Sequence, residues 1–151
     1  MPIVIAAVGN TPYNIFVVLH ILATIVAFAP AFVHPFFEAQ SKGYANRAEI
    51  WAKVVPRSQR IYGSALIVSG LLGFALAGMS DEVYKVSQGW LIASVIVWIA
   101  MNGVLHALIM PNEKKMADGD ANAQKLVDLG GATITLLLVV MLWLMVFKPG
   151  I

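Results

Sequence analysis

The stretch "VVLHILATIVAFAPAFVHPFF" covers residues 17–37 and decides the fold class. Its only ionisable side chains are those of His20 and His34, and everything else in it is apolar except one threonine. An apolar run of about 20 residues is what a helix needs to cross the ~30 Å hydrocarbon core of a bilayer. The stretch therefore predicts a membrane-spanning helix that carries two imidazole groups.

The composition extends this prediction to the whole chain. Of its 151 residues, 60% are hydrophobic and 12% are charged, whereas a soluble domain has about 25% charged residues. Continuous apolar stretches cover residues 13–37, 61–79, 89–110 and 126–147, and in lipid such stretches satisfy their backbone as helices. We expect an all-α, four-helix transmembrane bundle that forms a single domain over residues 1–151. The bilayer is its expected partner, and a formal net charge of +2 does not indicate nucleic acid.

The positive charges predict how the bundle is oriented. The loop after the first span has five Lys or Arg residues and the loop after the third has three, whereas the loop between them has only Lys85. Cytoplasmic loops are enriched in Lys and Arg. The first and third loops should therefore be cytoplasmic, with both termini on the other side. The N-terminus lacks the positive region of a cleaved signal peptide, so the first span is expected to be retained.

The ends of the first span are marked by prolines and by an unusual loop. Pro30 predicts a kink, and Pro35 predicts the end of the helix because proline disfavours helical geometry at the residue before it. In the loop that follows, apolar or small side chains recur on one helical face, namely Tyr44, Ala48, Trp51, Ala52 and Val55. This pattern favours a short amphipathic helix in the cytoplasmic interface, with a polar loop anchored by one tryptophan as the alternative.

The third span carries polar groups at four-residue intervals, namely Ser94, Trp98, Asn102 and His106. Lipid offers them no hydrogen-bond partner, so they are expected to face the interior of the bundle. They form either a hydrogen-bond network between helices or the wall of a cofactor site. Both interpretations stay open.

The three histidines suggest a haem b site, which needs two imidazoles on facing helices at similar depth. His34 and His106 both lie near the cytoplasmic ends of their spans, whereas His20 lies in the outer half of the first. Arg57 and Arg60 enter the second span near the depth of His34, where guanidinium groups can hold porphyrin propionates. Alternatively, these arginines only set the topology.

Several chemistries are excluded or disfavoured. The chain has no cysteine, which excludes disulfides, thiolate-held iron–sulfur clusters and covalently attached haem. Every Asp and Glu is expected in a loop or at the end of a span, which disfavours a proton-coupled pump and a di-metal carboxylate bundle. No motif assigns a catalytic residue, so both enzymatic and non-enzymatic functions remain open.

Four motifs carry a resemblance to known membrane proteins. They are "LHILATIVAFA" in the first span, "RSQRIYG" opening the second, a histidine in the third and "LLLVVMLWLMVFKPG" closing the fourth. Together they resemble bacterial four-helix inner-membrane proteins around HemJ, a haem-associated protoporphyrinogen oxidase. They are also similar to a related family of integral membrane proteins of about this length and of unknown function, and the layout is comparable to that of the copper-resistance CopD domain.

The resemblance implies a haem-related role for particular residues. It matches His20 to the first-helix histidine and His106 to the third-helix histidine of the family, and Arg60 with Tyr62 to a basic-aromatic entry into the second helix. Depth favours His34 with His106 instead, so all three histidines remain candidate metal ligands. Two departures from the family weigh against porphyrinogen oxidation itself: the acidic residue expected just before the fourth span has only Asp128 as a poor counterpart, and the tryptophan expected after the first histidine is absent.

Two other functions are kept as alternatives. The first is a non-enzymatic accessory or structural subunit of a membrane complex or homo-oligomer. It is suggested by the small extramembrane mass and by a stripe of small residues on the second span, Ala65, Ser69, Gly73 and Ala77, which favours close helix packing. The second is a copper-handling or transport component, suggested by the seven methionines, although methionine also serves as ordinary apolar filler.

Overall fold

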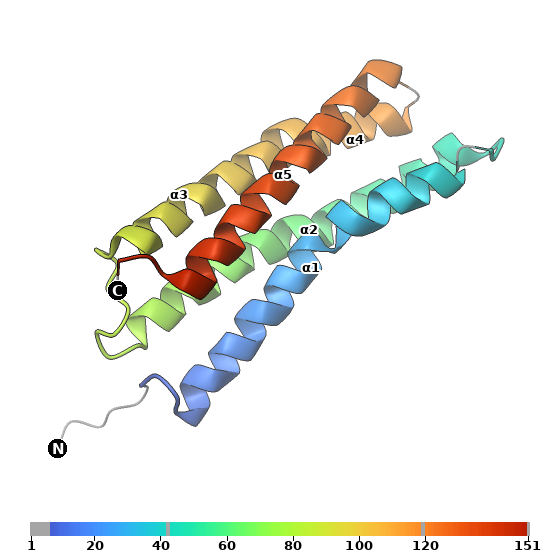
Figure 1. The fold of residues 1–151 in the computed structure, drawn as a ribbon. Coiled ribbons are helices and arrows are strands. Elements are labelled where there is room, and N and C mark those ends of the chain that lie inside the picture. The colour runs from blue at the N-terminus through green and yellow to red at the C-terminus, as the bar shows by residue number, and fades with distance from the viewer. Residues whose placement is uncertain (1–6, 42, 119, 151) are drawn as a thin grey trace.

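The computed structural model describes residues 7–41, 43–118 and 120–150. Its elements are α1 (Thr11–Ser41), α2 (Arg47–Gly78), α3 (Gly89–Gly103), the π-helix η1 (Val104–Ile109), α4 (Met110–Ala117) and α5 (Ala121–Phe147). Because α3, η1 and α4 follow one another without a break, they form one long helix, Gly89–Ala117. The described chain is therefore an all-α bundle of four helices long and apolar enough to span a membrane (Figure 1). Each predicted span falls on one of them.

The helices pack as two neighbouring pairs. α1 lies along α2, and α5 lies along the helix formed by α3, η1 and α4 (Figure 1). A central apolar core joins the pairs and consists of Ala27, Phe28, Tyr62, Leu66, Met101, Leu105, Ile109, Ile134 and Leu138. Large apolar side chains also cover the outer faces, such as Phe36 at 69% exposure and Val146 at 70%. Such a surface is suited to lipid rather than to water.

The first helix is longer than its prolines predict. α1 contains both Pro30 and Pro35 and continues to Ser41, so the prediction that Pro35 ends the span is wrong. Beyond Pro35, Phe37 packs edge-on against Trp51 of α2, and the Trp51 indole donates to the Ser41 hydroxyl at 3.2 Å. These contacts hold the last turns in place although proline removes a backbone donor. Figure 1 shows α1 changing direction part of the way along, as an internal proline predicts.

The predicted interfacial helix in the first loop is not present. Residues from Arg47 onward already belong to α2, which runs through Pro56 to Gly78. Trp51 and Val55 are 3% and 1% exposed, because they pack with Ala117 against the end of the third long helix. Trp51 and Val55 therefore contact other helices as part of the first turns of α2, whereas Tyr44, Ala48 and Ala52 of the predicted face are exposed.

The π-helix η1 changes which residues of the third long helix face inward. The buried positions after Met101 include Leu105, Ile109, Glu113 and Ala117, spaced four apart, together with Asn112. Residues four apart drift by about 40° around an α-helix, but the wider turn of a π-helix counteracts that drift. The predicted inward stripe consequently holds only in its first part: Ser94 is buried, whereas His106 is exposed.

Two adjacent glycines of α5 allow a test of this packing. A Cβ atom on Gly130 would lie 2.5 Å from Cγ1 of Ile109, whereas one on Gly131 would meet nothing within 4 Å. We expect Gly130→Ala to lower the free energy of unfolding by about 1–3 kcal/mol, as overpacking does. Gly131→Ala should instead raise it by up to about 1 kcal/mol, because alanine is a better helix former than glycine. Thermal unfolding of both variants in the same detergent measures the difference. Equal stability of the two would contradict the contact between α5 and η1.

Candidate functional site

A carboxylate lies inside the bundle, at the end where α4 and the first turns of α2 meet. Glu113 is 2% exposed and extends from α4. The prediction that every acidic residue lies in a loop or at a span end, with none directed inward, is wrong here. The third long helix continues past Pro111 to Ala117, so Glu113 is a helical residue of the core instead of a loop residue.

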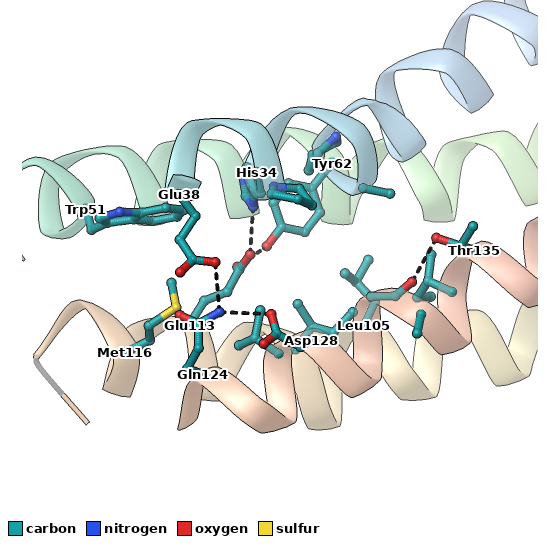
Figure 2. A pocket seen from close by; sticks show the side chains of 18 of the residues that line it. His34, Glu38, Trp51, Tyr62, Leu105, Glu113, Met116, Gln124, Asp128 and Thr135 are labelled. Atoms are coloured by element: carbon teal, nitrogen blue, oxygen red, sulfur yellow. Dashed lines mark hydrogen bonds and ion pairs between the residues drawn. The ribbon is translucent and has the colours of Figure 1, made fainter. Parts of the chain in front are cut away.

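Glu113 is hydrogen-bonded by side chains of two other helices. Nδ1 of His34, from α1, lies 3.0 Å from Oε1, and Nε2 of Gln59, from α2, donates to Oε2 at 3.0 Å. The Tyr62 hydroxyl, also from α2, donates to the same Oε2. Figure 2 shows His34 and Tyr62 directed at the Glu113 carboxylate. These four residues are called the Glu113 cluster below, and their hydrogen bonds offset the loss of hydration of a buried charge.

The Glu113 cluster borders a cavity of about 270 Å³, called the polar cavity. Beside His34 and Glu113, its walls include Glu38, Gln124 and Asp128. Nε2 of Gln124 donates to Glu38 at 3.0 Å and to Asp128 at 2.9 Å, as Figure 2 shows. Among the described residues that line this cavity, none is Lys or Arg. Its carboxylates therefore make it a negatively charged space.

A second, larger cavity of about 530 Å³ lies beside the first half of α1 and is called the apolar cavity. His20 lines it, and Nδ1 of His20 lies 2.7 Å from the Ser69 carbonyl oxygen. Because a carbonyl only accepts hydrogen bonds, Nδ1 carries the hydrogen, and Nε2 of the neutral ring keeps a lone pair. His20 is thus held in the tautomer that a metal ligand needs.

Glycines of α2 make room for the aromatic wall of the apolar cavity. A Cβ on Gly70 would collide with the indole of Trp98, and a Cβ on Gly73 would lie 3.4 Å from Cε1 of His20. The Trp98 indole donates to the Leu66 carbonyl at 2.8 Å. Gly70 and Gly73 of α2 therefore allow the rings of Trp98 and His20 to lie close to the helix backbone.

The central core separates the two cavities. Phe28, Met101 and Leu138 line the apolar cavity, whereas Leu105 and Ile134 line the polar one, and all five belong to the same apolar cluster. The two cavities thus lie toward opposite ends of the bundle, with an apolar layer between them.

The sequence-predicted site residues are not gathered in one place. His34 lies in the Glu113 cluster, whereas His20 lines the apolar cavity. His106 is exposed beside Gly63 of α2 and lines neither cavity. Asn102 donates to the Trp98 carbonyl of its own helix at 2.9 Å.

The two arginines proposed to hold propionates lie away from both cavities. Arg57 and Arg60 are exposed on α2 and line neither cavity. Within the described residues, no group of three or more His, Cys, Asp or Glu side chains is arranged to hold a metal ion.

Sequence reasoning missed Glu113 and its partner Gln59. The apolar run ends near residue 110 and Pro111 follows, which suggested the end of the helix. The signal that points to Glu113 is its spacing, since it lies four residues after Ile109 and eight after Leu105. Tyr62 was noted only through a resemblance, and nothing in its local sequence indicates a buried carboxylate partner.

The fold and its cavities define a four-helix integral membrane protein with a buried carboxylate–histidine cluster at one end and a histidine-bearing apolar cavity at the other. The family model described as "Predicted integral membrane protein (DUF2269)" matches residues 14–149, and the chain belongs to this family. The match confirms a multi-pass membrane protein of a family of unknown function, embedded in lipid, and it carries no link to HemJ or CopD. No curated protein and no solved structure matches the chain.

Removing the buried carboxylate tests the Glu113 cluster. Glu113→Ala leaves three donors without an acceptor, so we expect the free energy of unfolding to fall by about 1–3 kcal/mol for each unsatisfied donor. Glu49 is the matched control, because it forms an exposed pair with Lys53 at 2.6 Å and such pairs contribute little. Unfolding of both variants in mixed detergent micelles gives the comparison. A Glu113→Ala variant as stable as Glu49→Ala would contradict the hydrogen bonds described.

Proposed function

We propose that the protein binds haem b or a related porphyrin in the apolar cavity, with His20 as an axial ligand. The observation that carries the proposal is the hydrogen bond from Nδ1 of His20 to the Ser69 carbonyl, beside a cavity of about 530 Å³. Metal-ligating histidines characteristically donate their other ring N–H to a carbonyl or carboxylate. Bound haem would supply one-electron redox chemistry, and the chain would hold and shield it.

The other residues of the cavity fit the same group. Its walls are mostly apolar, and its volume falls within the range of about 300–1,000 Å³ of ligand pockets. The thioethers of Met101, Met141 and Met145 also line it, and methionine is a known axial haem ligand. Lys148, which lies 5.0 Å from the centre of the Tyr84 ring, is available to hold a propionate. In this proposal Lys148 holds the propionate, a role that was predicted from the sequence for Arg57 and Arg60.

The absorption spectrum tests the proposal. The wild-type protein, expressed with abundant haem and purified in detergent, is expected to show a Soret band. His20→Ala should lose that band or bind added haemin at least about tenfold more weakly, because the ligand nitrogen is gone. His106→Ala is the matched control, since His106 lines neither cavity, and its spectrum should equal that of the wild type. No band in the wild type after titration with haemin, or an unchanged band in His20→Ala, would contradict the proposal.

We also propose that the protein lies in the bacterial inner membrane with the first and third loops in the cytoplasm. The excess of Lys and Arg in these loops supports this orientation. It puts the polar cavity at the cytoplasmic end and the apolar cavity at the opposite end.

Single cysteines test the orientation, because the natural chain has none. Asn46→Cys marks the first loop and Glu82→Cys marks the second, and both positions are exposed. In intact spheroplasts, a membrane-impermeant maleimide is expected to label Glu82→Cys, and to label Asn46→Cys only after the membrane is opened. The reverse labelling pattern would show the opposite orientation.

A further inference from the structure

The Glu113 cluster has no part in the proposed binding of haem. It lies beyond the apolar core, and the polar cavity beside it shares no lining residue with the apolar cavity. Ionisable groups inside a membrane-spanning bundle are costly and are characteristically tied to a function. A π-helix, of the kind often found at functional sites, directly precedes the α4 turn that carries Glu113.

The hydrogen bonds of the cluster leave one partner to balance its charge. Gln59 and Tyr62 donate to Oε2 as neutral groups, and Gln59 uses its second N–H on the Met110 carbonyl at 2.7 Å. Of the partners described for Glu113, His34 alone can carry a positive charge. With His34 neutral and the carboxylate ionised, the buried cluster carries a full negative charge. With His34 protonated, it contains a hydrogen-bonded ion pair at 3.0 Å and is neutral overall.

Other charged groups face the same cavity. Glu38, from α1, lines it and is ion-paired with Arg47 of α2 at 3.3 Å, so its charge is balanced. Asp128, from α5, is an exposed carboxylate that shares the Gln124 amide with Glu38. The described lining of the cavity contains no Lys or Arg that could replace His34 as the cation beside Glu113.

We propose that His34 and Glu113 form a proton-binding site that loads and unloads through the polar cavity. Nδ1 of His34 keeps its hydrogen bond to Glu113, so a proton from water binds at Nε2 and leaves from the same atom to water. The apolar core closes the way to the other end, so the proton exchanges on one side only. The site is independent of haem and stands even where the apolar cavity takes another ligand.

Proton binding at this site changes how firmly the first helix is held. α1 packs mainly on α2, and the His34–Glu113 bond is a polar link from α1 to α4. With His34 protonated, the Coulomb attraction of an ion pair adds to the hydrogen bond that the neutral ring already makes to the carboxylate. The protonated site therefore binds α1 more tightly to the rest of the bundle than the unprotonated site does.

Histidine-selective NMR tests the proposal on the full chain. The sequence has three histidines, so ¹⁵N-histidine labelling gives three sets of ring signals, each assigned by replacing one histidine. In the wild type, His34 is expected to gain a proton at Nε2 in one transition as the pH falls. Glu113→Gln keeps the size of the side chain but removes its charge. It should move the His34 midpoint down by one pH unit or more, an at least tenfold loss of proton affinity.

Two controls make the result specific to the pair. Asp128→Asn removes an exposed carboxylate from the cavity and should shift the His34 midpoint by less than Glu113→Gln does. The His106 signal should titrate identically in all three proteins, because His106 lies outside the cluster.

Three outcomes would overturn the proposal. One is a His34 ring whose protonation does not change between about pH 4 and pH 9, which brackets ordinary imidazole titration. The others are a midpoint unaffected by Glu113→Gln and an equally large shift in Asp128→Asn. The first outcome needs no variant, so the test is decisive even where Glu113→Gln does not fold.

Discussion

A carboxylate buried among apolar helices must be met by hydrogen-bond donors, and the arrangement of one whole end of this bundle depends on that requirement. Glu113 takes its donors from His34 on α1 and from Gln59 and Tyr62 on α2. Lipid cannot replace these partners. The three helices must therefore meet at this level, and the third long helix reaches it by continuing past Pro111. The cluster explains why that helix is helical beyond its apolar span.

The two half-buried histidines make different hydrogen bonds at the two ends of the molecule. Both His20 and His34 use Nδ1 for a hydrogen bond, the first to a carbonyl and the second to a carboxylate. The hydrogen bond to a neutral carbonyl fixes the tautomer of His20, which is why we propose it as a metal ligand. A carboxylate and an imidazole can hold a proton between them as an ion pair, which is why we propose His34 and Glu113 as a proton-binding site. The apolar core lies between the two.

Much of the fold was predictable from the sequence, because a membrane-spanning helix is recognised from one continuous apolar stretch. Its recognition does not depend on which helices lie beside it. All four spans were located, and the family match confirms the membrane protein. The candidate site was less predictable. The four-residue pattern placed His106 inward, whereas η1 turns Glu113 inward and leaves His106 exposed. A π-helical turn has no simple sequence signature, so the facing of His106 was misjudged.

The sequence alone determined that this chain forms membrane-spanning helices with few polar groups among them, because length and apolar composition suffice for that conclusion. Only the tertiary structure decided where the helices end and which polar groups meet. Pro35 predicted the end of a helix and Pro111 follows the last predicted apolar residue of another, yet each of them, like Pro56, lies within a helix. The reason is that contacts between helices, such as those of Trp51 and Glu113, outweigh the local preference of proline, and those contacts exist only once the helices have packed.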